Sequence, residues 1–142
     1  MSAWLANCGW HQRVWRRARP VDGSFFQFTT DTTDDTEAER IRALNDKLRT
    51  KGEGGDIVIT RGIHALDANG VIEVIEAVQT FAAFEPANDP YGEHDCALLR
   101  VANQRVMFKI DYYNLTLTGH SPDAGDPAVT RRVLTIMLAD EY

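Results

Sequence analysis

The stretch NDPYGEHDCALLRVANQRVMFKIDYY, residues 88–113, decides the fold expected of this 142-residue chain. It contains two short runs rich in β-branched and aromatic residues, Cys96–Val101 and Arg105–Ile110, separated by three residues. Two such runs around a short polar break indicate a β-hairpin. We therefore expect the rest of the chain to pack around this hairpin and around the polar segment 88–95 that leads into it.

The loop between the two strands sets their pairing. With Asn103 and Gln104 as the loop, one face of the hairpin is apolar, with the pairs Val101/Val106, Leu99/Phe108, Ala97/Ile110 and Asp95/Tyr112. The other face carries the pairs Arg100/Met107, Leu98/Lys109, Cys96/Asp111 and His94/Tyr113. Side chains alternate along a strand, so ionisable groups gather at one end of this mixed face. A four-residue loop would keep the same pairing, whereas a three-residue loop would not.

Helical spacing of apolar residues precedes the hairpin. Residues 29–37 are predicted to be a polar linker, followed by an amphipathic helix over residues 37–50 that starts with a Thr36/Glu39 capping box. Residues 56–60 are a short apolar run typical of a buried strand. The clearest helix is capped by Asp67 and ended by Pro86, and its wide apolar side is expected to cover the hairpin.

The last element is ambiguous from the sequence. Asp126 followed by Pro127 predicts a helix start, and the apolar residues from Ala128 to about Ala139 fit a helical spacing. Short apolar runs also form strands, and this one is rich in β-branched residues, so a final strand remains the alternative. We predict the helix.

Together these elements predict an α+β fold in a single domain, in the order helix, strand, helix, β-hairpin, helix. Residues 1–36 form a less regular N-terminal segment, and residues 37–142 form the domain. A chain of this length is sufficient for one domain with a hydrophobic core. The expected core residues are Ile41, Leu44, Leu48, Ile57, Ile59, Val71, Val74, Ile75, Val78, Leu99, Val101, Val106, Phe108, Ile110, Val133, Ile136 and Met137.

Composition limits the classes of function. The net charge of −6 disfavours a general nucleic-acid-binding surface. Residues 1–21 contain three tryptophans and four arginines, and nucleic-acid binding remains possible through Arg13, Arg16, Arg17 and Arg19. Two distant cysteines, no apolar run of membrane-spanning length and no signal-peptide pattern favour a cytoplasmic protein. We recognise no cofactor motif and expect no cofactor.

The mixed end of the hairpin is the candidate site. Its candidate catalytic residues are His94, Asp95, Lys109 and Asp111, and its candidate metal ligands are His94 and Asp111. These residue types can perform acid–base or metal-assisted hydrolysis, with Glu93 or Asp95 as a further ligand or base. The same groups also form ordinary structural knots, in which carboxylates cap backbone N–H groups. We favour the structural interpretation, because no metal-binding spacing such as His-Glu-x-x-His is present.

Four segments resemble a known family: Ile41–Asp46, Asn88–Asp95, Lys109–Tyr113 and Arg132–Tyr142. The family consists of small, mostly alphaproteobacterial proteins, often carried on plasmids or other mobile elements, and is classed only as a domain of unknown function. The resemblance covers about residues 38–142 and implies no known activity. An aromatic residue is usual in the family where this chain has Cys96, and a tryptophan where it has Phe108.

The function favoured by the sequence is a non-catalytic, protein-interaction module. Such a module would regulate or inhibit a protein partner encoded by the host or by the same mobile element. Aromatic residues are over-represented at binding hot spots. The predicted binding residues are Tyr91, Glu93, His94, Tyr112 and Tyr113. The alternative is a metal-dependent hydrolase or nuclease that uses the His94/Asp95/Asp111/Lys109 cluster.

Overall fold

The structure is a computed structural model that describes the backbone of residues 27–142 and the side chains of residues 36–142. Its elements are α3 (Gln27–Lys51), β1 (Gly55–Ile59), α4 (Arg61–His64), α5 (Ala68–Thr80), β2 (Cys96–Val101), β3 (Gln104–Tyr113), β4 (Arg131–Leu138) and the 3₁₀ helix η1 (Ala139–Glu141). Helices and one four-stranded mixed sheet confirm the predicted α+β single-domain class.

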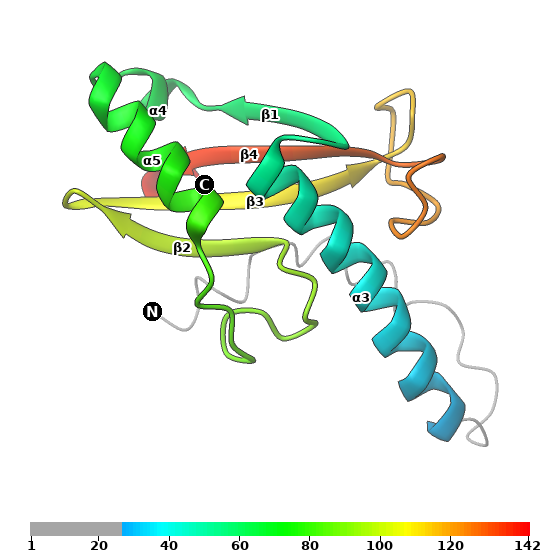
Figure 1. Ribbon diagram of the computed structural model, residues 1–142. Helices are drawn as coiled ribbons and strands as arrows, with labels where there is room; N and C mark the ends of the chain where they lie inside the picture. Colours follow the sequence, from blue (N-terminus) through cyan, green and yellow to red (C-terminus); the bar gives the residue numbers. More distant parts are fainter. Residues whose placement is uncertain (1–26) are drawn as a thin grey trace.

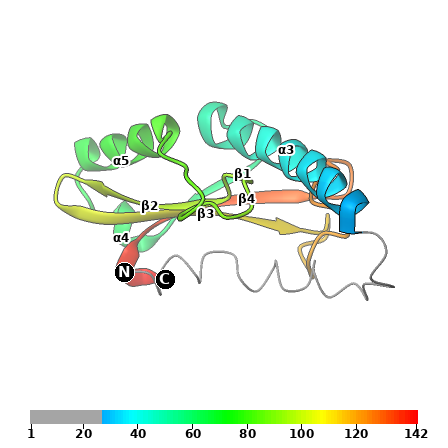
Figure 2. The same cartoon turned by 90° about the horizontal axis from the view of Figure 1, so that it is seen from below.

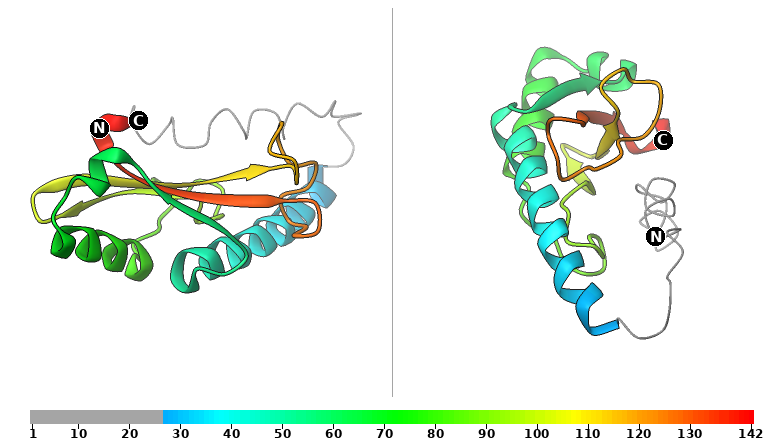
Figure 3. Two further views of the ribbon diagram at one scale, coloured as in Figure 1. Left: turned by 90° about the horizontal axis from the view of Figure 1, so that it is seen from above. Right: turned by 90° about the vertical axis from the view of Figure 1, so that its right-hand side faces the viewer.

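The sheet has the strand order β1-β4-β3-β2 (Figure 1). Strand β1 runs parallel to β4, whereas β3 is antiparallel to both β4 and β2. Helices α3 and α5 lie on the same face of the sheet, as the edge-on views show (Figures 2 and 3). We call this face the helix face and the opposite one the second face.

The hairpin forms as predicted, but its register differs by two residues. The loop consists of Ala102 and Asn103, and Leu99 pairs with Val106 rather than with Phe108. Both loop residues have positive φ, 45° and 66°, as a tight two-residue hairpin turn requires, and asparagine tolerates this conformation better than glutamine does. A shift of two residues keeps every side chain on its face, so the predicted apolar face is correct.

The final element is a strand, so the helix predicted from Ala128 to Ala139 is wrong. Strand β4 lies in the middle of the sheet between β1 and β3, where its β-branched residues can pair on both sides. Its side chains alternate, with Arg132, Leu134 and Ile136 buried. The carboxylate of Asp126 accepts from the N–H of Ala128 at 2.8 Å, which makes a local turn rather than the start of a helix.

Two further expectations need correction. Helix α3 begins at Gln27, so residues 29–37 are helical and not the predicted linker. The sequence predicts a buried strand over residues 56–60, but β1 is an edge strand in which Ile57 is 45% exposed. A short apolar run cannot by itself distinguish a central strand from an edge strand.

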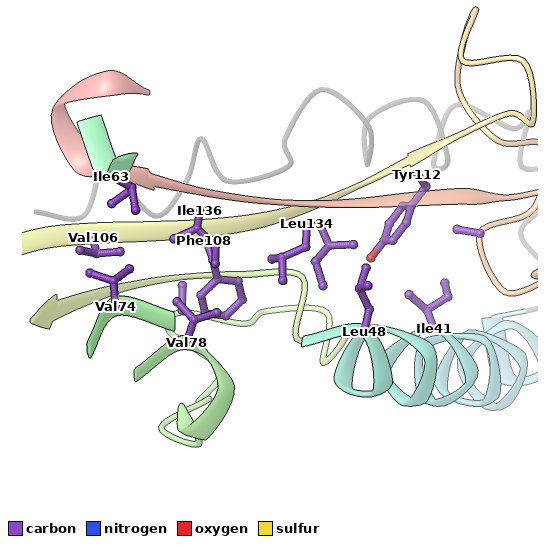
Figure 4. Close-up of a cluster of buried hydrophobic side chains, with 13 residues drawn as sticks. Ile41, Leu48, Ile63, Val74, Val78, Val106, Phe108, Tyr112, Leu134 and Ile136 are labelled. Atoms are coloured by element: carbon purple, nitrogen blue, oxygen red, sulfur yellow. The ribbon is translucent and has the colours of Figure 1, made fainter. Parts of the chain in front are cut away.

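The hydrophobic core lies between the helices and the sheet (Figure 4). Val74 and Val78 of α5 belong to the same cluster as Val106 and Phe108 of β3, so the predicted cover of the hairpin by this helix is confirmed. Asp67 caps the helix as expected, although the helix ends at Thr80. Within this cluster, Ile41 and Leu48 of α3 lie near Tyr112 and Leu134, as the close-up shows.

Candidate functional site

The polar segment before β2 is a loop held by its own side chains. Asn88 accepts a hydrogen bond from the N–H of Glu85 at 2.8 Å. The carboxylate of Asp89 accepts from the backbone N–H groups of Glu93, at 3.1 Å, and His94, at 3.2 Å. Asp89 is itself buried, and a buried carboxylate needs such donors. The side chains of Asn88 and Asp89, in the first half of segment 88–95, therefore stabilise the loop.

His94 is fixed between this loop and α3. Its Nδ1 lies 2.9 Å from the nearer carboxylate oxygen of Asp46, and its Nε2 lies 3.7 Å from Oδ2 of Asp89. Its ring stacks on Phe84, with centroids 3.8 Å apart and planes at 7°. The backbone of His94 has a φ of 54°, which is uncommon for a residue other than glycine. Its side chain is 23% exposed, so the imidazole serves mainly to join the loop to the helix.

A buried polar network continues from the loop into the core. The side-chain amide of Asn45 donates to the Tyr112 hydroxyl at 2.7 Å and to the carbonyl of Glu93 at 2.9 Å. The Tyr112 hydroxyl donates to the Glu93 carboxylate at 3.2 Å. Arg132 Nε donates to the Asn45 oxygen at 3.0 Å, and Arg132 Nη2 donates to the carbonyl of Ala124. Arg132 is only 1% exposed, so these bonds satisfy a charge inside the protein.

The electrostatics of this network favour a neutral tyrosine. Burial raises the pKa of Tyr112 well above its ordinary value of 10, and the carboxylates of Asp95 and Glu93 raise it further. The hydrogen bond from Asn45 and the charge of Arg132 act in the opposite direction. The guanidinium of Arg132 also lies over the Tyr112 ring, 5.3 Å from its centroid. Tyr112 is therefore a hydrogen-bonded core residue.

A second buried cation, Arg49, joins α3 to the end of α5. Its Nη1 donates to the carbonyls of Val78 at 2.8 Å and Phe81 at 2.9 Å, and its Nη2 pairs with Asp46 at 3.0 Å. Carbonyls at the C-terminal end of a helix have no partner within the helix and attract cations. The guanidinium also lies 5.2 Å from the centroid of the Phe84 ring. Arg49 thus fixes the helix end beside the His94 loop.

Lys109 and Asp111 form an ion pair on the second face, with Nζ and Oδ2 2.8 Å apart. Burial lowers the pKa of Lys109, but the hydrogen bond and charge of Asp111, with smaller effects of Tyr113 and Tyr142, raise it overall above 10.5. Lys109 Nζ also lies 6.0 Å from the centroid of the Tyr142 ring. We call Lys109, Tyr113 and Tyr142 the aromatic–lysine cluster.

Of the four candidate catalytic residues, the structure brings Lys109 and Asp111 into contact but places His94 elsewhere. His94 contacts Asp46, Asp89 and Phe84, whereas Lys109 pairs with Asp111 on the second face. Because the side chain of Tyr112 enters the core on the helix face, that of Asp111 points to the second face. Among residues 36–142, no group of three or more His, Cys, Asp and Glu side chains is arranged to hold a metal ion.

The predicted binding residues and Asp95 fall into a buried group and an accessible group. Tyr112, Glu93 and Asp95 are buried, and the carbonyl of Asp95 accepts from the N–H of Ile110 at 2.7 Å. Tyr91 and Tyr113 are half-buried and remain accessible. The N-terminal basic residues lie outside the described residues: Arg13, Arg16, Arg17 and Arg19.

Sequence reasoning missed the partners that organise the loop. Asn45 follows Ile41 by four residues and precedes Leu48 by three, so it occupies a core position of the amphipathic helix. A polar residue at such a position signals a buried hydrogen bond, and this signal was available. Arg132 gave no comparable signal, because its burial depends on β4 being a central strand.

Comparisons place this chain among known sequences. The family model described as "Protein of unknown function (DUF3768)" matches residues 59–141. No curated protein and no solved structure gives a significant match. None of the helices that the structure describes has the length and apolar character needed to cross a membrane.

Proposed function

The chain belongs to this DUF3768 family of unknown function, and we propose from its surface residues that it is a non-catalytic protein-interaction module. In this proposal it regulates or inhibits a protein partner encoded by its bacterial host or by the same mobile element. The bacterial and mobile-element parts of the proposal come from the sequence resemblance, and a cytoplasmic location is proposed from the cysteine content and the apolar pattern of the sequence. The choice of a protein partner comes from the residues on the second face.

The observation that supports this function most directly is the aromatic–lysine cluster. Tyr142 is 47% exposed, and Tyr113 and Lys109 are partly exposed beside it. Tyrosine presents a large, stiff, amphipathic surface, and it is enriched at the residues that dominate binding energy. The ion pair with Asp111 holds the Lys109 side chain in place, so the lysine ammonium group is already positioned before a partner binds. A surface of this kind suits a protein partner with an acidic and apolar patch.

The internal use of the His94 loop supports a non-catalytic module. The nearer Asp46 oxygen and one Asp89 oxygen face the two ring nitrogens of His94, and Asp89 also caps the loop N–H groups. Catalysis by His94 would require a ring nitrogen directed at substrate. The structural role of these side chains explains why segment 88–95 is so rich in polar residues, and no catalytic role is needed to explain it.

The test is capture of a partner from cells of the source organism, followed by binding with the purified partner. We expect Tyr113→Ala/Tyr142→Ala to weaken binding by about 2 kcal/mol or more, the threshold that defines a hot spot. Leu115→Ala is the matched control, because Leu115 is 57% exposed in the loop after β3 and lies outside the aromatic–lysine cluster. It should leave binding unchanged.

Two results would contradict this function. A partner that binds the double variant as tightly as the natural chain would exclude the aromatic–lysine cluster as the contact surface. A hydrolase or nuclease activity with Mg²⁺, Mn²⁺ or Zn²⁺ that His94→Ala abolishes, while the fold is retained, would replace the interaction module by the metal-dependent alternative.

A further inference from the structure

Strand β1 presents an open edge of the sheet. It pairs with β4 on one side, and no strand among the described residues lies on its other side. Two neighbouring apolar residues are exposed on it, Ile57 at 45% and Val58 at 46%. Ile59 packs against the core on the helix face, so Ile57 lies on that face and Val58 on the second face. Both faces of this edge are therefore apolar.

The outward hydrogen-bonding groups of β1 follow from one bond. The N–H of Thr60 donates to the carbonyl of Ile136 on β4 at 3.0 Å. Backbone groups alternate in direction along a strand, so Val58 and Asp56 also direct theirs toward β4. Gly55, Ile57 and Ile59 then direct their N–H and C=O groups outward. The edge can bind a further strand.

The edge lacks the usual devices that prevent pairing. Natural edge strands carry lysine, proline, bulges or inward-pointing charges that block a further strand. The single charged residue of β1 is Asp56, and its carboxylate pairs with Arg131 Nε of β4 at 2.8 Å. Its charge is thereby directed along the sheet toward β4. The exposed side chains at the middle of the edge are those of Ile57 and Val58.

We propose that a second copy of this chain occupies this edge, with the two β1 strands antiparallel across a two-fold axis. A two-fold interface requires a surface that complements itself. Pairing centred on Val58 places each Val58 opposite the other and each Ile57 opposite Ile59 of the second copy. Asp56 then faces the uncharged Thr60. All three central pairs are apolar, and no like charges face each other.

Only one other register with a similar number of paired residues lets the outward N–H and C=O groups of the two β1 strands hydrogen-bond to each other. An outward-directed residue must face another outward-directed residue, so the two-fold axis can pass through Val58 or Ile57 but not between them. Centring on Ile57 would place Val58 opposite Asp56 of the second copy, which sets an apolar side chain against a carboxylate. Complementarity therefore selects the register centred on Val58, and the two four-stranded sheets become one continuous sheet.

This dimer forms through the backbone edge of β1, whereas the aromatic–lysine cluster centres on β3 and the C-terminal residue, so different substitutions test the dimer and the proposed function. An interface of two short strands is small beside the ~1,600 Å² of a stable complex. We therefore expect reversible association with a dissociation constant on the order of 10 μM, which corresponds to weak binding.

The first test is sedimentation equilibrium of the full chain from about 1 to 200 μM, a range that brackets this dissociation constant. Val58→Lys should weaken self-association at least tenfold. Gln104→Lys is the matched control, because Gln104 is exposed in the β2–β3 hairpin, which does not pair with β1, and it should leave association unchanged. Circular dichroism checks that both variants are folded. A chain that is monomeric throughout, or a dimer that survives Val58→Lys, overturns the proposal.

The second test reads the register without weakening the interface. Directly opposed, non-hydrogen-bonded residues have Cα atoms about 4.5 Å apart, within the range that a disulfide spans. In a Cys8→Ser background, Val58→Cys should form a disulfide-linked dimer under mild oxidation, and Ile57→Cys should form much less. Cys96 is 2% exposed and should not contribute. Equal or greater cross-linking of Ile57→Cys overturns the register centred on Val58.

Discussion

Tyr112 and Asp111 are neighbours on β3, yet they occupy two different environments. The side chain of Tyr112 lies on the helix face, where its hydroxyl hydrogen-bonds to Asn45 and Glu93 and its ring lies under the guanidinium of Arg132. Asp111 lies on the second face, where it forms an ion pair with the partly exposed Lys109. The alternation of side chains along β3 thus separates a buried polar network on the helix face from an ion pair on the second face that reaches solvent through its lysine.

The difference predicts how much each polar group contributes to stability. On the helix face, loss of one member leaves others buried without partners, and an unsatisfied buried group is costly. On the second face, Asp111 is also buried, but Lys109 is partly exposed, so water screens this ion pair and it contributes less. The comparison can be tested by removing one member from each side.

The largest effect is expected for Arg132→Met. Arg132 is the cation of the buried network, and its loss leaves the Asn45 oxygen and the Ala124 carbonyl without these bonds. Breaking a buried charge arrangement typically costs about 3–5 kcal/mol of unfolding free energy. Arg131→Met on the same strand is the control, because Arg131 is 47% exposed, and it should cost under about 1 kcal/mol. Urea unfolding measures both, and equal costs would break the comparison.

Tyr112→Phe should have an intermediate effect that depends on pH. Removing the hydroxyl leaves the Asn45 amide and the Glu93 carboxylate with one partner fewer, which should cost about 1–3 kcal/mol near pH 7. The pKa of Tyr112 is raised in the folded protein, so the neutral form is favoured there. Its contribution is complete below pH 10, the ordinary pKa, and is lost as the pH rises through the folded pKa.

The measurement is the unfolding free energy of the natural chain and of Tyr112→Phe between pH 7 and pH 11. The natural chain should lose its advantage above about pH 10, at up to about 1.4 kcal/mol per pH unit. Tyr113→Phe, which removes a hydroxyl from a half-buried position on the second face, is measured in parallel as the control for loss of a tyrosine hydroxyl outside the buried network. A constant difference between the natural chain and Tyr112→Phe would show that the tyrosine titrates normally.

The sequence predicted those features that depend on local periodicity. The hairpin faces, the Asp67 cap and the cover of the hairpin by α5 all follow from apolar spacing and turn residues. The β4 strand was missed, because its apolar residues fit both periods and only pairing with β1 and β3 selects the strand. Because the sequence predicts a helix in place of β4, it does not reveal the parallel β1–β4 pair or the exposed edge.

The candidate site was predicted less well, for a related reason. His94 was grouped with Lys109 and Asp111 because the hairpin pairing alone brings them to one end. In the structure the φ of 54° at His94 turns the chain out of the strand, and the side chain reaches Asp46 of α3 instead. Contacts between residues 46 and 94 depend on tertiary packing, which no spacing within the motif reveals.

The smallest effect is expected for Lys109→Met, which removes the ion pair on the second face. Lys109 is 29% exposed in its side chain and Asp111 is 11% exposed, so water reaches the pair from the lysine side. We expect a loss of about 1 kcal/mol or less near pH 7. The pKa of Lys109 is raised, so this contribution is complete below pH 10.5 and is lost as the pH rises through the folded value. It should also shrink in 1 M salt, where charges are screened within about 3 Å. Thermal unfolding of the natural chain and of Lys109→Met at low and high salt measures both effects. A loss that matches Arg132→Met and resists salt would mean that the ion pair is a core element, and the contrast between the two sides of β3 would be wrong.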